Sequence, residues 1–262
     1  ECLVGSEMGI RDRYNCKLGK GCGLIEETLS LLEIYQDGMT IDALLEYVHQ
    51  SNTLSKCTEL RTKDIVKLVF YPRLMSRNPK VPIWLKEIRN KGLLLHHFKQ
   101  LLLLYCAREN AVIYDYIINI LNEFRLSGAE KINADSIKNF VVNIVNSGQA
   151  NWGESICVRQ ARYIKKVLVE FDMINNQNQI LPYEIYSFTV LYLMHELHFE
   201  GLSDVAIWNH DDWKLFGLDK YQVQDKIMEF NLKGGYIAQC TGDLMTISWK
   251  YNTMEEFING TL

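Results

Sequence analysis

Prolines and paired cysteines are what this sequence has least of. Its 262 residues include 4 prolines and 7 cysteines, and no two cysteines form a C-x-x-C pair. Few prolines favour long helices. Scattered thiols in an odd number are typical of a reduced interior rather than of a disulfide framework or a zinc site. Walker, Rossmann and G-x-S-x-G motifs are also missing, which predicts a protein that is not an enzyme and needs no cofactor or metal.

A net positive charge and a long apolar run are absent as well. The formal charge is −4, so any contact with a polyanion has to come from a local basic face. The most apolar stretch, residues 92–107, is interrupted by His96, His97 and Lys99 and is shorter than the roughly 20 residues that a membrane-spanning helix needs. The first residues lack a basic region followed by an apolar one. The sequence therefore predicts a cytoplasmic protein without a membrane partner.

Apolar residues repeat at spacings of three and four along most of the chain, which indicates helices. The predicted fold class is mainly α: a helical bundle with helix-turn-helix or winged-helix elements and a short C-terminal β-hairpin. Breaks in the pattern divide the chain into an N-terminal helical region with a helix-turn-helix-like unit (1–78), a central helical bundle (79–200) and a C-terminal winged-helix-like unit (201–262). The central bundle includes a basic helix and wing at 151–181.

The stretch 151–181 carries the strongest functional signal. Five apolar residues alternate there at spacings of four and three, which places them in one buried stripe of a helix: Cys157, Ala161, Ile164, Leu168 and Phe171. Arg159, Arg162 and Lys166 fall on the opposite side, with Lys165 beside them. A basic face opposite a buried stripe suits a helix that approaches phosphates. The ordinary alternative is a solvated face without a ligand.

The ends of this stretch also have predicted structures. Asn151 and Glu154 have the spacing of a capping box, with Ser155 as a rival helix start. The polar run 175–179 predicts a short hairpin or wing beside the basic helix.

A second, less regular pattern of this kind lies nearer the N-terminus. Thr40 is expected to cap a helix over 41–50, and a further helix from about Thr58 is expected to bend or stop at Pro72. In that helix Leu68 is expected to face inward. The basic residues proposed as secondary nucleic-acid contacts are Arg61, Lys63, Lys67 and Arg73.

Residues 202–262 predict three helices and then two strands, 236–240 and 244–249, which is winged-helix order. The third of these helices carries acidic and basic residues together, so the unit fits protein docking as well as DNA contact. Trp208 and Trp213 are interpreted as core anchors.

Two clusters raise the question of a metal. His195 and His198 are three residues apart rather than four and have no evident third ligand, so ordinary polar contacts are the better interpretation. Cys16 and Cys22 lie around a glycine-rich run and are expected to be more exposed than the other thiols, but no neighbouring histidine or acid pair completes a metal set.

Short motifs, each different from the others, are spread in a characteristic order and spacing along nearly the whole chain. They are Gly21, Gly23, Leu24, Glu26, Asn52, Leu54, Thr62 and Arg73-Leu74 at the front, Trp152, Arg159, Arg162 and Asp172-Met173-Ile174 in the middle, and His195, Gly201, Ser203-Asp204, Trp213, Phe216-Gly217-Leu218, Gly242-Asp243-Leu244 and Trp249-Lys250-Tyr251 at the end. This order and spacing resemble the BrxA family of bacteriophage exclusion (BREX) systems. The resemblance implies a non-enzymatic, mainly helical protein, similar in part to the antitermination factor NusB. It also implies helix-turn-helix or winged elements that bind DNA beside the other BREX components.

These observations lead to a first hypothesis and two alternatives. The first is a DNA-binding accessory subunit for phage defence, with double-stranded DNA and other BREX components as partners. The alternatives are a protein-protein adaptor whose winged units dock partner subunits and an RNA-binding, NusB-like factor. No oligomeric state is predicted.

Overall fold

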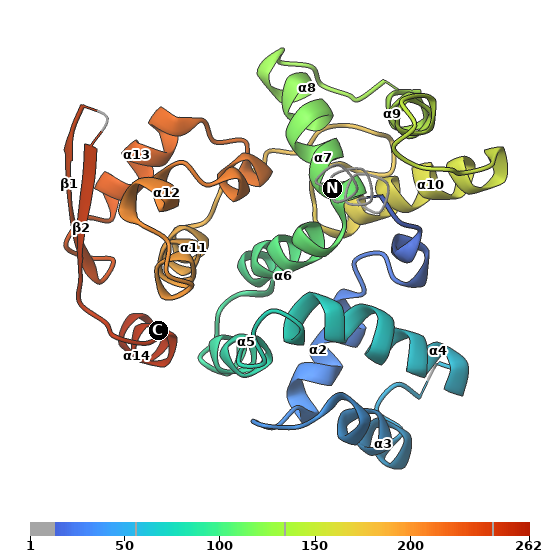
Figure 1. Ribbon diagram of the computed structural model, residues 1–262, viewed down its shortest axis with the longest axis horizontal. Helices are drawn as coiled ribbons and strands as arrows, with labels where there is room; N and C mark the ends of the chain where they lie inside the picture. The colour runs from blue at the N-terminus through green and yellow to red at the C-terminus, as the bar shows by residue number, and fades with distance from the viewer. Residues whose placement is uncertain (1–13, 56, 134, 243) are drawn as a thin grey trace, which may run out of the picture. The chain divides into compact units, whose positions relative to one another are not determined.

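The protein is mainly helical, with a two-stranded antiparallel hairpin near the C-terminus (Figure 1), which confirms the predicted fold class. This computed structural model describes residues 14–55, 57–133, 135–242 and 244–262. The elements up to residue 126 are η1 (Lys17–Lys20), α2 (Ile25–Ile34), α3 (Ile41–Ser51), α4 (Glu59–Asp64), η2 (Ile65–Met75), α5 (Val81–Asn90), α6 (Leu95–Glu109), α7 (Ala111–Tyr116), η3 (Ile117–Leu121) and α8 (Asn122–Leu126). Those that follow are α9 (Ser136–Asn146), α10 (Glu154–Glu170), α11 (Ser187–Phe199), α12 (Asp204–Trp208), η4 (Asp211–Phe216), α13 (Lys220–Glu229), β1 (Tyr236–Thr241), β2 (Leu244–Trp249) and α14 (Met254–Thr261).

Backbone contacts group the chain into two compact units, each built from two stretches. The first unit contains the described residues up to Val81 together with Leu102–Tyr183, and the second contains Pro82–Leu101 and Glu184–Leu262. The central region expected from the sequence contributes to both units. The division into three regions itself stays a prediction.

Side-chain caps set several helix starts. A threonine or serine oxygen accepts a hydrogen bond from the backbone N–H three residues on at Thr40, Thr58, Ser203 and Thr253. The start of α10 is different, and the capping box predicted at Asn151 is wrong. This helix begins after Gly153, which has an extended backbone and no side chain that could cap it.

The helix that was expected to bend or stop at Pro72 does not stop there. Ile65–Met75 form the π-helix η2, in which hydrogen bonds run from residue i to residue i+5. The helix continues past Pro72 although that residue has no N–H to donate. The wider turn also shifts the phase of the side chains: Leu68, expected inside, is 41% exposed, while Val66 and Phe70 are buried.

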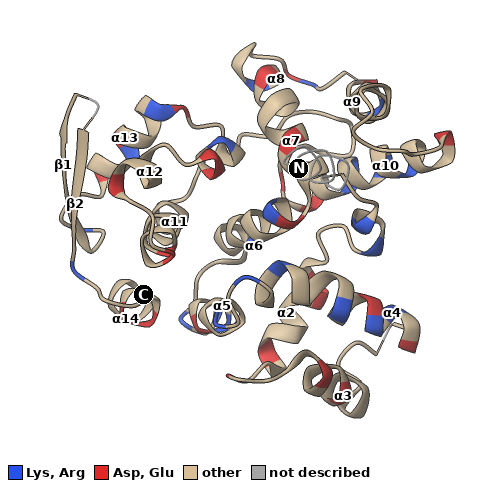
Figure 2. Ribbon diagram, in the orientation of Figure 1, with Lys and Arg blue, Asp and Glu red and all other residues tan. Residues whose placement is uncertain are grey.

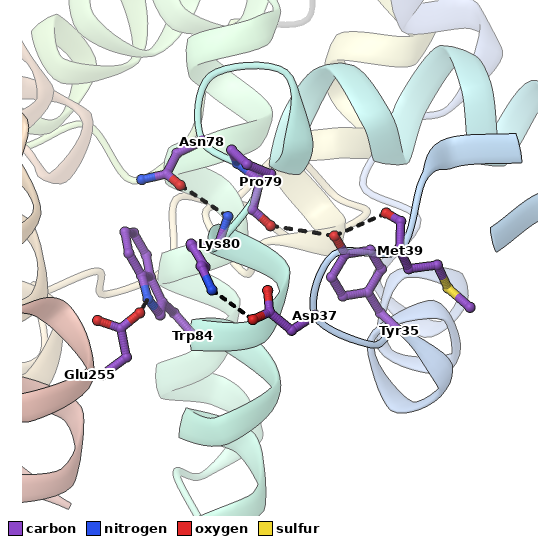
Figure 3. A network of polar contacts seen from close by, with 8 residues as sticks. All are labelled: Tyr35, Asp37, Met39, Asn78, Pro79, Lys80, Trp84 and Glu255. Carbon is purple, nitrogen blue, oxygen red and sulfur yellow. Dashed lines mark hydrogen bonds and ion pairs between the residues drawn. The ribbon is translucent and has the colours of Figure 1, made fainter. Parts of the chain in front are cut away.

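Polar contacts close the turn after α2 in the first unit (Figure 3). The Tyr35 hydroxyl lies 3.3 Å from the carbonyl oxygen of Met39 and 3.4 Å from that of Pro79. Lys80 Nζ donates to Asp37 Oδ2 at 2.6 Å, and this hydrogen bond lowers the pKa of the exposed Asp37 carboxyl. The end of α2 is thereby held to the segment that leads into α5.

An aromatic cluster forms around His195 in the core of the second unit. The His195 side chain is completely buried. Its ring stacks on Phe257 with centroids 4.0 Å apart, and Trp249 meets it edge-on at 5.0 Å. Its Nδ1 lies 2.8 Å from the carbonyl oxygen of Leu191. His195 is therefore a core residue.

Acid should destabilise the second unit through His195. Burial lowers the pKa of its imidazole from 6.5 to about 4. Between these values the unfolded chain binds a proton that the folded protein excludes, so stability is intact above the unfolded pKa and falls as the pH drops toward 4. The loss between pH 7 and pH 5 should be about 2 kcal/mol. Urea denaturation at both pH values should show this loss in the wild type and a smaller one in His195→Phe, whereas equal losses would contradict the assignment.

The C-terminal hairpin and the two tryptophans before it match their predictions. β1 and β2 pair with Tyr236 opposite Trp249 and Thr241 opposite Leu244. Trp208 and Trp213 are each 1% exposed, and their indole N–H groups donate to backbone carbonyls. Both tryptophans anchor the core of the second unit.

Candidate nucleic-acid interface

Helix α10 has one apolar side and one basic side. Of the predicted stripe, Cys157, Ile164, Leu168 and Phe171 are buried, and Ala161 is half-buried. Helix α9 packs against α10. Burial of the stripe determines which residues face outward.

The outward side of α10 carries the predicted basic residues. Arg159, Arg162 and Lys166 are exposed, and Lys165 is half-exposed. Lys166 Nζ lies 3.8 Å from Glu170 Oε1, a loose surface pair of the kind that is worth only a few tenths of a kcal/mol. In the described part of the chain, no salt bridge joins Arg159 or Arg162 to a carboxylate.

The predicted wing follows α10 directly as a small paired turn. Ile174 and Ile180 form an antiparallel bridge, and the N–H of Asn175 donates to the carbonyl oxygen of Gln179 at 2.9 Å. Lys165 Nζ donates to the carbonyl oxygen of Asn176 at 3.0 Å. The basic side of α10 and the wing are therefore joined by a direct contact.

A third extended segment completes this arrangement. Lys131 forms an antiparallel bridge with Gln179, and the N–H of Ile180 donates to the carbonyl oxygen of Glu130 at 2.9 Å. Along the chain, a helical segment (111–126) comes first, and Lys131, which pairs with the wing, follows it. Helices α9 and α10 and then the paired turn come next. The pairing of the wing with the segment before α9 fixes its position beside α10.

The secondary basic residues on α4 and η2 have different surroundings. Lys63 is exposed. Lys67 Nζ lies 2.6 Å from Asp42 Oδ1 in a surface ion pair. The Arg61 guanidinium donates to the backbone carbonyl of Lys20 in η1. These three side chains remain candidate contacts.

The prediction for Arg73 is corrected by its burial. Arg73 is 9% exposed, and its guanidinium donates to the carbonyl oxygens of Gly21 at 2.6 Å, Cys22 at 2.7 Å and Gly23 at 3.0 Å. The π-helical winding turns this side chain inward. Arg73 is therefore a structural residue that holds the glycine-rich segment, and it is not available to a nucleic acid.

The glycine-rich segment is also held from α10. The N–H of Gly23 donates to Glu170 Oε2 at 2.5 Å, and a Cβ on Gly23 would lie 2.6 Å from the same oxygen. Cys22, expected to be exposed, is 7% exposed, and burial raises the pKa of its thiol to about 11. The glycines thus permit a close approach of backbone to α10.

Two lysines of η1 were not among the contacts predicted from the sequence, and one of them, Lys20, lies beside α10. Lys17 and Lys20 belong to η1, which packs against both α10 and η2. Figure 2 shows basic residues on α10 and α4. Helix η1 contacts both sets, because Arg61 of α4 donates to the carbonyl oxygen of Lys20 and Lys20 lines a pocket together with Arg159 of α10. The signal in the sequence that could have indicated them is the pair of lysines in the glycine-rich run KLGKGCG at 17–23. We use the term basic face for Arg159, Arg162, Lys165 and Lys166 with Lys20.

No group of three or more His, Cys, Asp or Glu side chains among the described residues is arranged to hold a metal ion. None of the helices described is both long enough and apolar enough to cross a lipid bilayer.

Comparison with known proteins identifies the family. The model of the BrxA family matches residues 12–196. The chain belongs to the BrxA family. This confirms the resemblance found in the sequence, and it associates the protein with BREX systems. The matched range contains the whole basic face, α4 and the wing. No curated protein matches the chain.

A solved structure shares the fold. The crystal structure of an uncharacterized protein from Magnetospirillum magneticum superposes with a TM-score of 0.60 at 14% sequence identity, covering 79% of this chain and 100% of that chain. At this identity the likeness concerns the fold alone, because proteins of one fold carry out many unrelated functions.

Proposed function

We propose that this BrxA-family chain is a non-enzymatic, cytoplasmic DNA-binding accessory protein of a BREX system, and that α10 is its reading helix. The observation that carries the proposal is the exposed row of Arg159, Arg162 and Lys166, two of which have no salt bridge to a carboxylate in the described residues. The contacts that these side chains make within the protein are weak surface ones: Lys166 pairs loosely with Glu170, and Arg159 Nε donates to the carbonyl oxygen of Ser155 at 3.3 Å. Exposed cations held this weakly remain available to phosphates.

The elements around α10 support this proposal. The elements follow the order of a winged helix: the helical segment 111–126, the paired residue Lys131, helices α9 and α10, and the paired turn. In that arrangement the last helix and the wing are the parts that would contact a DNA duplex. Arg159 and Lys166 are seven residues apart, which corresponds to about 10 Å along a helix. The major groove is about 12 Å wide and admits an α-helix. A helix such as α10 can therefore lie in the major groove, with the charged row along its exposed side.

The second unit favours an additional protein contact. Helix α13, the turn after it and β2 expose large apolar side chains: Tyr221 and Leu232 are each 73% exposed, and Leu244 is 65% exposed. Exposed apolar groups of this kind are typical of protein-docking surfaces. The adaptor alternative is therefore kept for this unit, where the partner would be another BREX component. RNA binding by a NusB-like factor is the remaining alternative.

A titration of labelled duplex DNA at 50 mM and 200 mM salt tests the proposal. If Arg159, Arg162 and Lys166 each meet one phosphate, the affinity should fall about 40-fold between the two conditions, because each contact adds roughly 0.9 to the logarithmic salt slope. Absence of binding at 50 mM salt would contradict DNA binding and leave the adaptor. Stronger competition by single-stranded RNA than by unlabelled duplex would favour the RNA alternative.

A further inference from the structure

A pocket of about 240 Å³ opens between η1 and α10 in the first unit, beside the row of exposed cations. The side chains that matter in its lining are Lys20, Arg159, Gln160 and Tyr163. Gly19 also lines it, and a Cβ on that glycine would lie 3.0 Å from Tyr163 Cε2. The glycine therefore allows η1 to approach the tyrosine ring.

The amide of Gln160 is the feature of this pocket that needs an explanation. Gln160 is 1% exposed, and its Oε1 has no hydrogen-bond partner within the described part of the chain. A buried polar atom without a hydrogen-bond partner costs about 1–3 kcal/mol, and such atoms are uncommon in native proteins. Because Gln160 lines the pocket, a bound molecule with a hydrogen-bond donor can supply the missing bond to Oε1.

The other lining groups restrict the chemistry of that molecule. The Arg159 guanidinium has no salt bridge to a carboxylate among the described residues, and Lys20 Nζ lies 2.9 Å from Asp64 Oδ2 at the surface. These cations favour an anionic group. Tyr163 adds an aromatic ring to the lining, and the guanidinium carbon of Arg162 lies 6.0 Å from the centre of that ring.

We propose that this pocket holds a single nucleotide, with the edge of its base on the Gln160 amide and its phosphate at Arg159 and Lys20. A nucleobase edge presents a donor beside an acceptor, which complements the oxygen and NH₂ of a glutamine amide. An apolar ligand would leave the amide unpaired. A volume of about 240 Å³ is below the roughly 300–1,000 Å³ of sites for drug-sized ligands, which suits one base better than a dinucleotide.

The nucleotide can come from two sources. It can be a free nucleoside monophosphate or an unpaired nucleotide of a DNA strand, since a base that leaves the stack can enter a protein pocket. The second source rests on the proposed DNA binding by α10, whereas the first does not.

Calorimetric titration of the full chain with AMP, GMP, CMP, TMP and inorganic phosphate tests the pocket. We expect at least one nucleoside monophosphate to bind more tightly than phosphate alone. In Gln160→Met, which keeps an unbranched side chain and removes the amide, that affinity should fall at least tenfold. The variant should unfold at the same or a higher temperature, because a buried amide oxygen without a hydrogen-bond partner is removed. Binding by none of the four nucleotides, or equal binding by the variant, would overturn the proposal.

A second measurement uses only the wild-type protein. Cys16 is exposed and lines the same pocket, so a bound nucleotide should slow its alkylation by a maleimide. An unchanged alkylation rate at saturating nucleotide would count against this location.

DNA substrates then distinguish the two sources. A duplex with one bulged nucleotide should bind the wild type about tenfold more tightly than a fully paired duplex, and Gln160→Met should lose this preference. If nucleoside monophosphates bind but the bulge gives no advantage, the ligand is a free nucleotide. If nucleotides bind and the paired duplex does not, the pocket stands and the proposed DNA binding fails. If the paired duplex binds and nucleotides do not, the pocket fails alone.

Discussion

Replacing Arg159, Arg162 and Lys166 together by alanine should weaken binding of duplex DNA on the order of 100-fold or more at 100 mM salt. Each lost phosphate contact removes close to a tenfold factor at this salt concentration, because fewer condensed counterions are released. All three side chains are exposed. The substitutions should therefore change the free energy of unfolding by less than about 0.5 kcal/mol. Fluorescence anisotropy with a labelled duplex measures the affinity, and thermal unfolding verifies the fold.

A matched control variant separates the effect of where the charges lie from the effect of the protein's net charge on DNA affinity. Lys91, Lys233 and Lys250 are exposed residues of the second unit. Changing all three to alanine removes the same number of positive charges as the α10 variant does. This variant should bind within about threefold of the wild type if α10 makes the contact. Equal losses in the two triple variants would mean that total charge, rather than the basic face, determines the affinity.

Replacing Arg73 by methionine should lower the free energy of unfolding by about 3–5 kcal/mol. The substitution leaves buried charge-assisted hydrogen bonds unmade, and the carbonyl oxygens of Gly21, Cys22 and Gly23 lose their donor. For a chain of this size 1 kcal/mol corresponds to about 2–4 °C in Tm, so the midpoint should drop by roughly 10 °C. Thermal unfolding followed by circular dichroism measures this shift.

Two further variants define the role of Arg73. Arg73→Lys keeps the charge but presents its donors from one nitrogen instead of from a planar fork, so it should recover part of the stability that the methionine variant loses. Arg77→Met, at an exposed position four residues on, should stay within about 0.5 kcal/mol of the wild type. A large loss of DNA affinity in Arg73→Met at a temperature where it is folded, with unchanged stability, would restore Arg73 as a direct contact.

Local pattern was sufficient to predict the two sides of α10. The apolar stripe of Ile164, Leu168 and Phe171 and the exposure of Arg159 and Arg162 follow from the helical repeat. The caps at Thr40 and Thr58 were predictable for the same reason, because a cap involves only residues three apart.

Features that depend on distant contacts were not predictable in this way. Arg73 has the charge of a surface residue, and nothing nearby in the sequence shows that a π-helix directs it to carbonyls about fifty residues away. Lys20 was missed because its importance comes from the packing of η1 against α10. The pairing of Lys131 with Gln179 likewise joins segments that no local repeat connects.

Mass-spectrometric mapping of lysine labelling, with and without saturating duplex DNA, tests the placement of the nucleic acid on α10 most directly. The predicted result is several-fold slower modification of Lys165 and Lys166, and of Lys20 beside them, with unchanged rates at Lys91, Lys233 and Lys250. Unchanged labelling of Lys165 and Lys166 together with protection of the second-unit lysines would contradict it.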